Sequence, residues 1–154
     1  MASIDVKSKD QPYLVKRGAG YYEYQLPISV KAVISLDGLV PLLMNERDEW
    51  ELPGGKLDLG ESPISCVERE CMEELGIEVH VGNCVSSWVY QIFADRHVLI
   101  VTYLARALAG SIPSFSHEHK KLALVNPSDV FGLHMPEGYK LAVQEAVKAD
   151  WFRT

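Results

Sequence analysis

Length, composition and charge place the chain among ordinary globular proteins. Its 154 residues are about what one domain uses, and 47% hydrophobic with 23% charged residues exclude a disordered, collagen-like or coiled-coil chain. The formal net charge of -6 gives no long-range attraction to a nucleic-acid backbone or an anionic membrane. We therefore predict a single domain over residues 1–154. Any phosphate-binding site in it must depend on the residues at that site and not on the overall charge of the protein.

The chain carries no predicted membrane or secretion segment and no cysteine framework. Its longest apolar run, residues 98–105, is far shorter than the roughly 20 residues that span a bilayer, and residues 1–11 carry charges where a signal peptide needs an apolar stretch. Cys66, Cys71 and Cys84 form no Cys-x-x-Cys pair, which argues against disulfides and a zinc site. We expect a cytoplasmic protein with reduced, packed cysteines.

The first predicted elements are strands. Residues 28–36 are rich in β-branched side chains, and a turn at Asp37-Gly38 leads to a second strand over residues 39–45, which together indicate a β-hairpin. Glycine and proline break residues 50–59, so we predict a loop there.

The pattern then changes to a helix over residues 63–75. Ser62 is suited to the N-cap, Pro63 to the first helical position and Gly76 to the C-terminal cap. Apolar side chains follow at spacings of three and four: Ile64, Val67, Cys71 and Leu75.

The second half of the chain returns to strands and closes with a helix. Residues 85–93 and 97–107 are rich in Val, Ile, Tyr and Trp and predict two strands, and residues 122–125 predict a shorter one. Residues 136–151 predict an amphipathic helix with the apolar stripe Tyr139, Val143, Val147 and Trp151. The order of elements indicates an α/β fold with a mixed sheet covered on both faces.

The predicted helix over residues 63–75 concentrates acidic side chains. Glu70, Glu73 and Glu74 stand at i, i+3 and i+4, where like charges repel by a few tenths of a kcal/mol per pair. The last two also lie in the final turn, where the helix dipole disfavours anions by about 0.3–1 kcal/mol each. A solvated surface explains most charge runs, but a bound cation would cancel this penalty. Carboxylates without nearby His or Cys suit Mg²⁺ or Mn²⁺, which also bind phosphate oxygens.

Residues 55–77 resemble the Nudix box, whose pattern is Gly-x5-Glu-x7-Arg-Glu-U-x-Glu-Glu-x-Gly-U with U apolar. The fixed positions are filled by Gly55, Glu61, Arg69, Glu70, Glu73, Glu74 and Gly76, with Cys71 and Ile77 at the apolar places. Chance would give such a match on the order of once in a million chains of this length. Weaker similarity extends over residues 28–151, including the Trp50 to Lys56 run, whereas residues 1–25 are expected to be a flexible or poorly matched extension.

The resemblance implies a MutT-like Nudix hydrolase with an α/β/α sandwich and a mixed sheet between helices. Such an enzyme cleaves a pyrophosphate bond in a nucleoside diphosphate linked to another moiety, using Mg²⁺ or Mn²⁺. The implied metal ligands are the Gly55 carbonyl, Glu61, Glu70, Glu73 and Glu74. The implied catalytic residues are Arg69, which would hold Glu70, together with Glu70 and Glu73; Glu118 competes with Glu70 as general base. Arg47 and Arg96 are candidate substrate-binding residues, although turn arginines are commonly solvated.

Several alternatives stay open at this point. Trp50, Trp88, Tyr90 and Phe93 could stack a nucleobase, but aromatic residues on strands more often pack in the core.

His117 and His119 could bind a metal, but a lone His-x-His near a turn is more often solvated or hydrogen-bonded. The competing function is a non-catalytic Nudix-like module that binds a nucleotide, which would be expected to lose box glutamates. We expect a small nucleotide as partner, no membrane or polymeric nucleic acid, and leave a homodimer open; the sequence does not identify the nucleotide.

Overall fold

The computed structural model describes residues 14–153. The elements are β1 (Leu14–Arg17), β2 (Tyr21–Tyr24), β3 (Ile28–Ser35), β4 (Val40–Met44), β5 (Trp50–Glu51), β6 (Gly54–Lys56), α1 (Pro63–Leu75), β7 (Val79–Phe93), β8 (Arg96–Ala107), β9 (Lys121–Val125), the 3₁₀ helix η1 (Pro127–Gly132) and α2 (Glu137–Lys148). The strands form a sheet of order β6-β3-β8-β7, a second of order β5-β4-β9 and the separate pair β1-β2. Because β3 and β8 are parallel and the other pairs antiparallel, the first sheet is mixed, as predicted.

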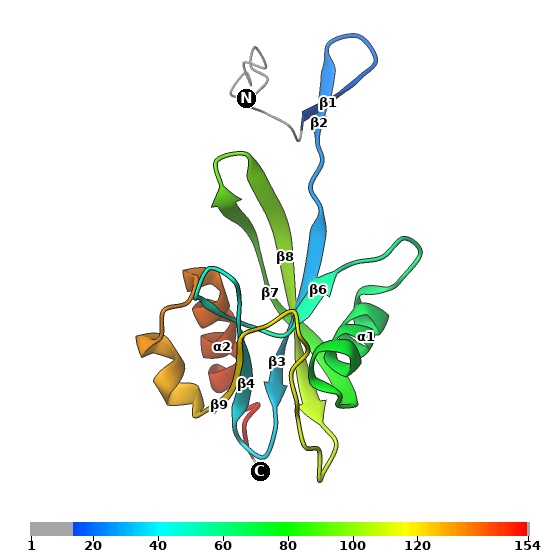
Figure 1. Cartoon of the computed structure of the whole chain (residues 1–154). Coiled ribbons are helices and arrows are strands. Elements are labelled where there is room, and N and C mark those ends of the chain that lie inside the picture. Colours follow the sequence, from blue (N-terminus) through cyan, green and yellow to red (C-terminus); the bar gives the residue numbers. More distant parts are fainter. Residues whose placement is uncertain (1–13, 154) are drawn as a thin grey trace.

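The two long helices cover opposite sides of the strands (Figure 1). Strand β3 lies between them and alternates its side chains, so that Val30, Ala32 and Ile34 pack toward α1 while Val33 packs toward α2. Both of its faces are therefore buried, which explains why apolar side chains occur on both faces of the strand, with Lys31 as its one charged residue.

Helix α1 has the predicted bounds and caps. The Ser62 hydroxyl accepts a hydrogen bond from the Ser65 amide at 3.1 Å, and Gly76 adopts a φ of 67° as the C-cap. The predicted apolar stripe was wrong at its start, because Ile64 is 45% exposed. Cys66 is buried in its place, since the face toward β3 is rotated from the stripe that the spacing indicated.

The predicted β-hairpin over residues 28–45 was correct at its turn and wrong in its strands. Asp37 and Gly38 adopt positive φ angles of 51° and 82°, and Leu36 and Leu39 exchange two hydrogen bonds of 2.9 and 3.0 Å. Beyond that bridge the strands separate, because β3 pairs with β6 and β8 while β4 pairs with β5 and β9. The predicted loop over residues 50–59 supplies two of these partners, β5 and β6.

The later elements also depart from their predicted limits. Strand β7 begins at Val79, ahead of residue 85, and bulges where its register shifts against β8. Helix α2 ends at Lys148, with Val147 47% exposed and Trp151 beyond the helix end. Trp151 nevertheless packs against the α2-side core, and its indole N–H donates to the Ala105 carbonyl at 2.8 Å.

The N-terminal region contains structure that the sequence did not indicate. Residues 14–24, part of the predicted extension over residues 1–25, form the antiparallel pair β1-β2, which stands apart from the two larger sheets (Figure 1). Residues 1–13 lie outside the described residues. Within residues 14–153, no helix is both long and apolar enough to cross a membrane.

Candidate active site

One group of charged residues surrounds Arg69 on α1; we call Asp58, Glu61, Arg69, Glu70 and Glu73 the Arg69 cluster. The guanidinium donates to Glu61 at 2.7 and 3.0 Å, to Glu70 at 2.9 Å and to Glu73 at 3.1 Å, and lies 3.4 Å from Asp58. These charge-assisted bonds raise the pKa of Arg69 and lower the pKa of Glu61 to about 2. Arg69 thus fixes the orientation of three box carboxylates.

Glu70 lies against the backbone of β6. A Cβ atom at Gly55 would be 2.6 Å from the Glu70 carboxylate, so only glycine allows this close approach. Strand β6 and helix α1 therefore bring the first box glycine and a box carboxylate together, although they are far apart in the sequence.

A second group lies deeper, beside the same helix; we call Lys31, Glu51, Glu74 and His119 the Lys31 cluster. The His119 Nε2 lies 3.1 Å from Glu51 Oε1 and 3.7 Å from Glu74 Oε2, and both carboxylate side chains are at most 14% exposed. Lys31 Nζ donates to the Gly54 carbonyl at 3.1 Å. Among residues 14–153, no hydrogen-bond partner is found for Glu74 Oε2 or His119 Nδ1. Two buried polar atoms are thus available to a ligand.

Burial and charge act in opposite directions on these carboxylates. Burial raises the pKa of Glu74, and the nearby Glu70 charge raises it further, while Lys31 and His119 oppose the shift. Burial also acts to raise the pKa of Glu51, but the Lys31 charge and hydrogen bonds with His119 and Asn45 hold it lowered to about 2. Glu51 is therefore a stable anion, whereas the Glu74 carboxylate lacks sufficient positive charge around it.

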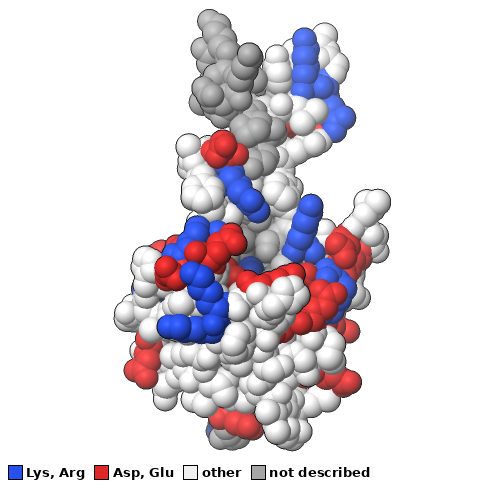
Figure 2. Space-filling model, viewed as in Figure 1, with Lys and Arg blue, Asp and Glu red and all other residues white. Residues whose placement is uncertain are grey.

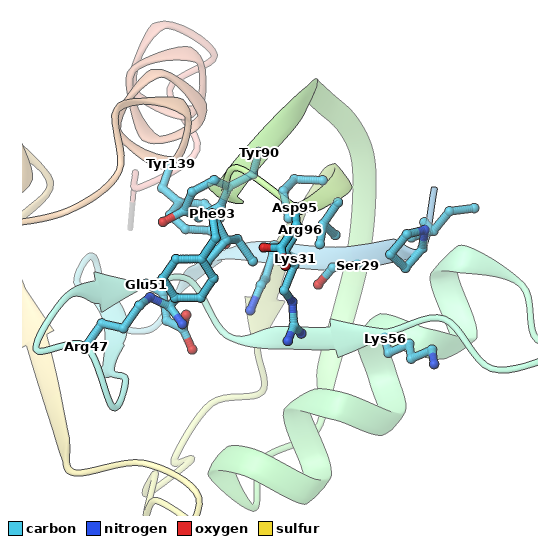
Figure 3. Close-up of a pocket in the computed structure, with 15 residues that line it drawn as sticks. Ser29, Lys31, Arg47, Glu51, Lys56, Tyr90, Phe93, Asp95, Arg96 and Tyr139 are labelled. Atoms are coloured by element: carbon cyan, nitrogen blue, oxygen red, sulfur yellow. The ribbon is translucent and has the colours of Figure 1, made fainter. Parts of the chain in front are cut away.

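A cavity of about 720 Å³ opens beside the Lys31 cluster. Its lining residues come from β3, the β4–β6 region, the β7–β8 hairpin and α2: Pro27, Ile28, Ser29, Lys31, Arg47, Glu51, Lys56, Tyr90, Ile92, Phe93, Asp95, Arg96, Val98, Ile100 and Tyr139. Tyr90, Phe93 and Tyr139 gather at one side of it, whereas Lys56 lies at the other, toward α1 (Figure 3). Acidic and basic side chains form a band around the hollow on this face, and the region below the band is largely uncharged (Figure 2).

The predicted substrate-binding arginines lie in this cavity. Arg47 and Arg96 both line its wall, and Arg47 is oriented by a 2.8 Å hydrogen bond to Glu49. Of the four candidate stacking residues, Tyr90 and Phe93 line the cavity, while Trp88 stacks behind Tyr90 at 4.9 Å between ring centroids and Trp50 packs against the core.

The loop before β9 contributes a residue that sequence reasoning ranked low. Glu118 and His117 are exposed, whereas His119 is directed to Glu51 and Glu74. The loop is held there because the amides of Ser114 and Ser116 donate to the last carbonyls of α1, those of Leu75 and Glu74.

The sequence did not lead us to predict Lys31 or Glu51 as residues of the site. The signal for Lys31 was a lysine inside an otherwise apolar strand, which predicts a buried charge with partners.

The carboxylates suit a divalent ion in type, although the side chains do not enclose one. Within residues 14–153, no three His, Cys, Asp or Glu side chains are arranged to hold a metal ion. Glu73, one of the predicted ligands, is 58% exposed and held by Arg69. Mg²⁺ needs only one or two carboxylates when water and phosphate complete its shell. Glu70 and Glu74 could provide these, and Glu74 Oε2, which accepts no hydrogen bond from residues 14–153, could bind such an ion. The residues therefore fit a magnesium-type ion.

Comparison with known proteins identifies the family of this chain. The NUDIX domain family matches residues 27–145. The chain is 30% identical to the CTP pyrophosphohydrolase of Escherichia coli (strain K12) over 105 residues, which cover 65% of this chain and 76% of that protein. It is 37% identical to the 8-oxo-dGTP diphosphatase of the same organism over 63 residues, covering 41% and 48%.

The fold is also similar to that of a solved structure from this family. The crystal structure of a MutT NUDIX hydrolase from Burkholderia pseudomallei aligns with a TM-score of 0.68 at 28% identity, covering 79% of this chain and 98% of that one. Because the family match spans most of the chain and contains both charged clusters, this protein belongs to the Nudix family, and the two relatives named above are a pyrophosphohydrolase and a diphosphatase.

Proposed function

We propose that the protein hydrolyses the pyrophosphate bond of a nucleoside diphosphate derivative in a reaction that depends on Mg²⁺ or Mn²⁺, with nucleoside triphosphates as the first class to test. One observation carries this proposal: a single cavity joins an aromatic side, several basic side chains and Glu51, which contacts His119 at 3.1 Å, and His119 in turn lies 3.7 Å from Glu74 of the Nudix box. Two similar proteins are named for CTP and 8-oxo-dGTP, both nucleoside triphosphates, which supports the same substrate class.

The cavity suggests how the substrate is oriented. Tyr90 and Phe93 offer ring surfaces that can stack a base, while Lys56 and Arg96 offer positive charge to phosphates. Lys56 directly follows Gly55, so phosphates bound there lie next to Glu70. The nucleobase of the substrate then extends toward Tyr139 and α2.

The box residues divide the chemistry between them. A divalent ion bound by Glu70 and Glu74, with Gly55, Glu61 and Glu73 as the other proposed ligands, would neutralise phosphate charge and lower the pKa of a bound water. Arg69 holds the Glu70 carboxylate in one orientation by its 2.9 Å hydrogen bond. We assign Glu70 as the base that accepts a proton from the attacking water, because the alternative, Glu118, is exposed on its loop.

The test is a panel of nucleoside triphosphates and other nucleoside diphosphate derivatives, assayed with Mg²⁺, with Mn²⁺ and in excess chelator. We expect turnover of at least one compound with either ion and loss of turnover in chelator. Full activity in chelator would contradict the metal-dependent mechanism. If no compound is hydrolysed but some raise the thermal unfolding midpoint, the non-catalytic nucleotide-binding function replaces hydrolysis. A cytoplasmic location and a homodimer stay predictions.

A further inference from the structure

Lys31 is a buried lysine in the middle of β3, where the chain around it is apolar. Its neighbours Val30 and Ala32 pack under α1, so Lys31 faces the opposite side together with Val33. The side chain is 6% exposed, and its ammonium lies 6.0 Å from the centroid of the Tyr139 ring. A buried ammonium is costly unless it is paired with negative charge or hydrogen-bond acceptors.

The backbone fixes where this ammonium lies. Strands β3 and β6 pair with Lys31 opposite Gly54, and Lys31 Nζ donates to the Gly54 carbonyl at 3.1 Å. A Cβ at Gly54 would come within 2.1 Å of the Val30 carbonyl oxygen, and the residue has a φ of 135°, so this approach requires glycine. The Lys31 contact is therefore part of the sheet and not a mobile surface arrangement.

Three carboxylates from two elements, β5 and α1, act on this ammonium. Burial lowers the pKa of Lys31, but the Tyr139 hydroxyl and the charges of Glu51, Glu74 and Glu70 outweigh it and raise the pKa above its ordinary value. Lys31 is consequently cationic, and its charge reaches two of the residues proposed to bind a divalent ion.

We propose that Lys31 is an internal counter-cation of the carboxylates in this site, and that it weakens the binding of a divalent ion to Glu70 and Glu74. The inference rests on the proposed function for the identity of the ion. Lys31 Nζ contacts the Gly54 carbonyl, and the adjacent Gly55 lies against the Glu70 carboxylate, so the ammonium is near this carboxylate. Opposite unit charges in such a partly buried site interact strongly enough to change a binding constant about tenfold or more. With Lys31 present, ion binding depends more on the phosphate oxygens that the substrate brings. Lys31 is thus a positioning residue that favours joint binding of ion and substrate.

The experiment measures Mn²⁺ binding to the full chain without nucleotide, from the electron paramagnetic resonance signal of free Mn²⁺. The variants are Lys31→Met, Lys31→Arg and Lys56→Met, the last of which removes a lysine from the exposed rim of the same cavity. We expect Lys31→Met to bind Mn²⁺ at least about tenfold more tightly than the parent. Lys31→Arg and Lys56→Met should stay within about threefold, because one keeps the charge and the other removes a solvent-screened charge.

Nucleotide provides a second readout. Saturating, non-hydrolysable nucleotide should tighten Mn²⁺ binding more in the parent than in Lys31→Met, because the parent depends more on phosphate oxygens. A Lys31→Met affinity that is unchanged or weaker would overturn the inference, and so would an equal gain in Lys56→Met. A parent that neither binds Mn²⁺ nor hydrolyses a nucleotide would overturn the proposed function as well.

A double-mutant cycle in excess chelator tests the charge pairing by a measurement that does not depend on Mn²⁺ binding, in case Lys31→Met fails to fold properly. Thermal unfolding is compared for the parent, Lys31→Met, Glu74→Gln and the double variant. We expect Lys31→Met alone to lower the midpoint and the double variant to recover part of the loss, because the neutral amide no longer needs a counter-charge. Strictly additive changes would contradict the charge pairing, whatever the metal affinity.

Discussion

The Arg69 cluster and the Lys31 cluster both include residues of α1, but their charges are compensated to different degrees. In the Arg69 cluster one guanidinium contacts four carboxylates, and its side chain is 28% exposed. In the Lys31 cluster the groups are more deeply buried, and within residues 14–153 Glu74 Oε2 and His119 Nδ1 have no hydrogen-bond partner. The charges of the first cluster are therefore paired within the cluster, whereas the second cluster contains buried polar atoms without hydrogen bonds to the described residues.

This difference distinguishes residues that orient other side chains from residues that bind a ligand. A satisfied network of charge-assisted hydrogen bonds holds side chains in one orientation, which suits residues that position others. A buried carboxylate without enough positive charge destabilises the fold and is expected where a ligand supplies the missing charge. Glu70 belongs to the Arg69 cluster but its charge acts on Glu74, so it connects the support to the binding residues.

Replacing Glu74 should give the largest effect. Glu74→Gln is expected to lower kcat by about 10⁴-fold or more, because it removes a buried proposed metal ligand. The same change should leave the fold intact and slightly raise the unfolding midpoint in chelator, since it removes a buried anion from the last turn of α1. Steady-state kinetics and thermal unfolding measure the two effects. A variant that is fully active, or one that is unfolded, would contradict the assignment.

The next comparison identifies the general base. Glu70→Gln should lower kcat by about 10³-fold or more, while Glu118→Gln should cost less than about 10²-fold, the lower end of what a positioned base contributes. Both variants are assayed on every substrate that the parent hydrolyses. A severe loss of kcat in Glu118→Gln on every substrate would identify Glu118 as the general base. The loop that carries Glu118 would then have to close over the substrate.

Acid titration tests the pairing of Glu51. Its pKa is lowered from 4.5 to about 2, so the stability that it contributes is present above about pH 4.5 and is lost as the pH falls toward 2. This contribution is on the order of 3 kcal/mol, and Glu51→Gln should lack it. The free energy of unfolding of the parent and the variant should therefore converge in acid.

The exposed Glu118→Gln variant serves as the matched control for this titration, and its curve should follow the parent throughout. A constant difference between Glu51→Gln and the parent across this pH range would show that Glu51 is not held as a paired anion.

The cysteines should give the smallest effects. Cys71→Ser places a hydroxyl in the apolar core under α1 and should cost about 1–2 kcal/mol of stability. Cys66 is also buried, but its thiol lies 3.6 and 3.7 Å from the carbonyl oxygens of Lys56 and Gly55, which a serine hydroxyl can use. Cys84 is exposed, contrary to the prediction that all three are packed, and its replacement should change stability by less than about 0.5 kcal/mol.

All three cysteine variants should keep the kcat of the parent. Thermal unfolding and kinetics measured on the same samples separate a packing role from a chemical one. A loss of kcat without a loss of stability would reveal a reactive thiol.

Local signals determined the box helix almost completely. The N-cap, the proline and the terminal glycine act within a few residues of the ends of α1, so its bounds followed from Ser62, Pro63 and Gly76 alone. The spacing of Glu70, Glu73 and Glu74 likewise indicated a charged face of this helix. It did not show that Glu73 is directed to Arg69 and solvent while Glu74 is buried, because that depends on what packs against each side of the helix.

The sequence by itself therefore determined the class of fold, the box helix and the oxygen-ligand chemistry, all of which depend on near neighbours or on a motif. Only the tertiary structure decided that His119 contacts both Glu51 and Glu74, and that Lys31 contacts Gly54. Their contacts arise because β3 pairs with β6, and because the loop before β9 caps the last carbonyls of α1. Such contacts join residues far apart in the chain, and each is chosen by the packing of the whole molecule, which no local pattern encodes.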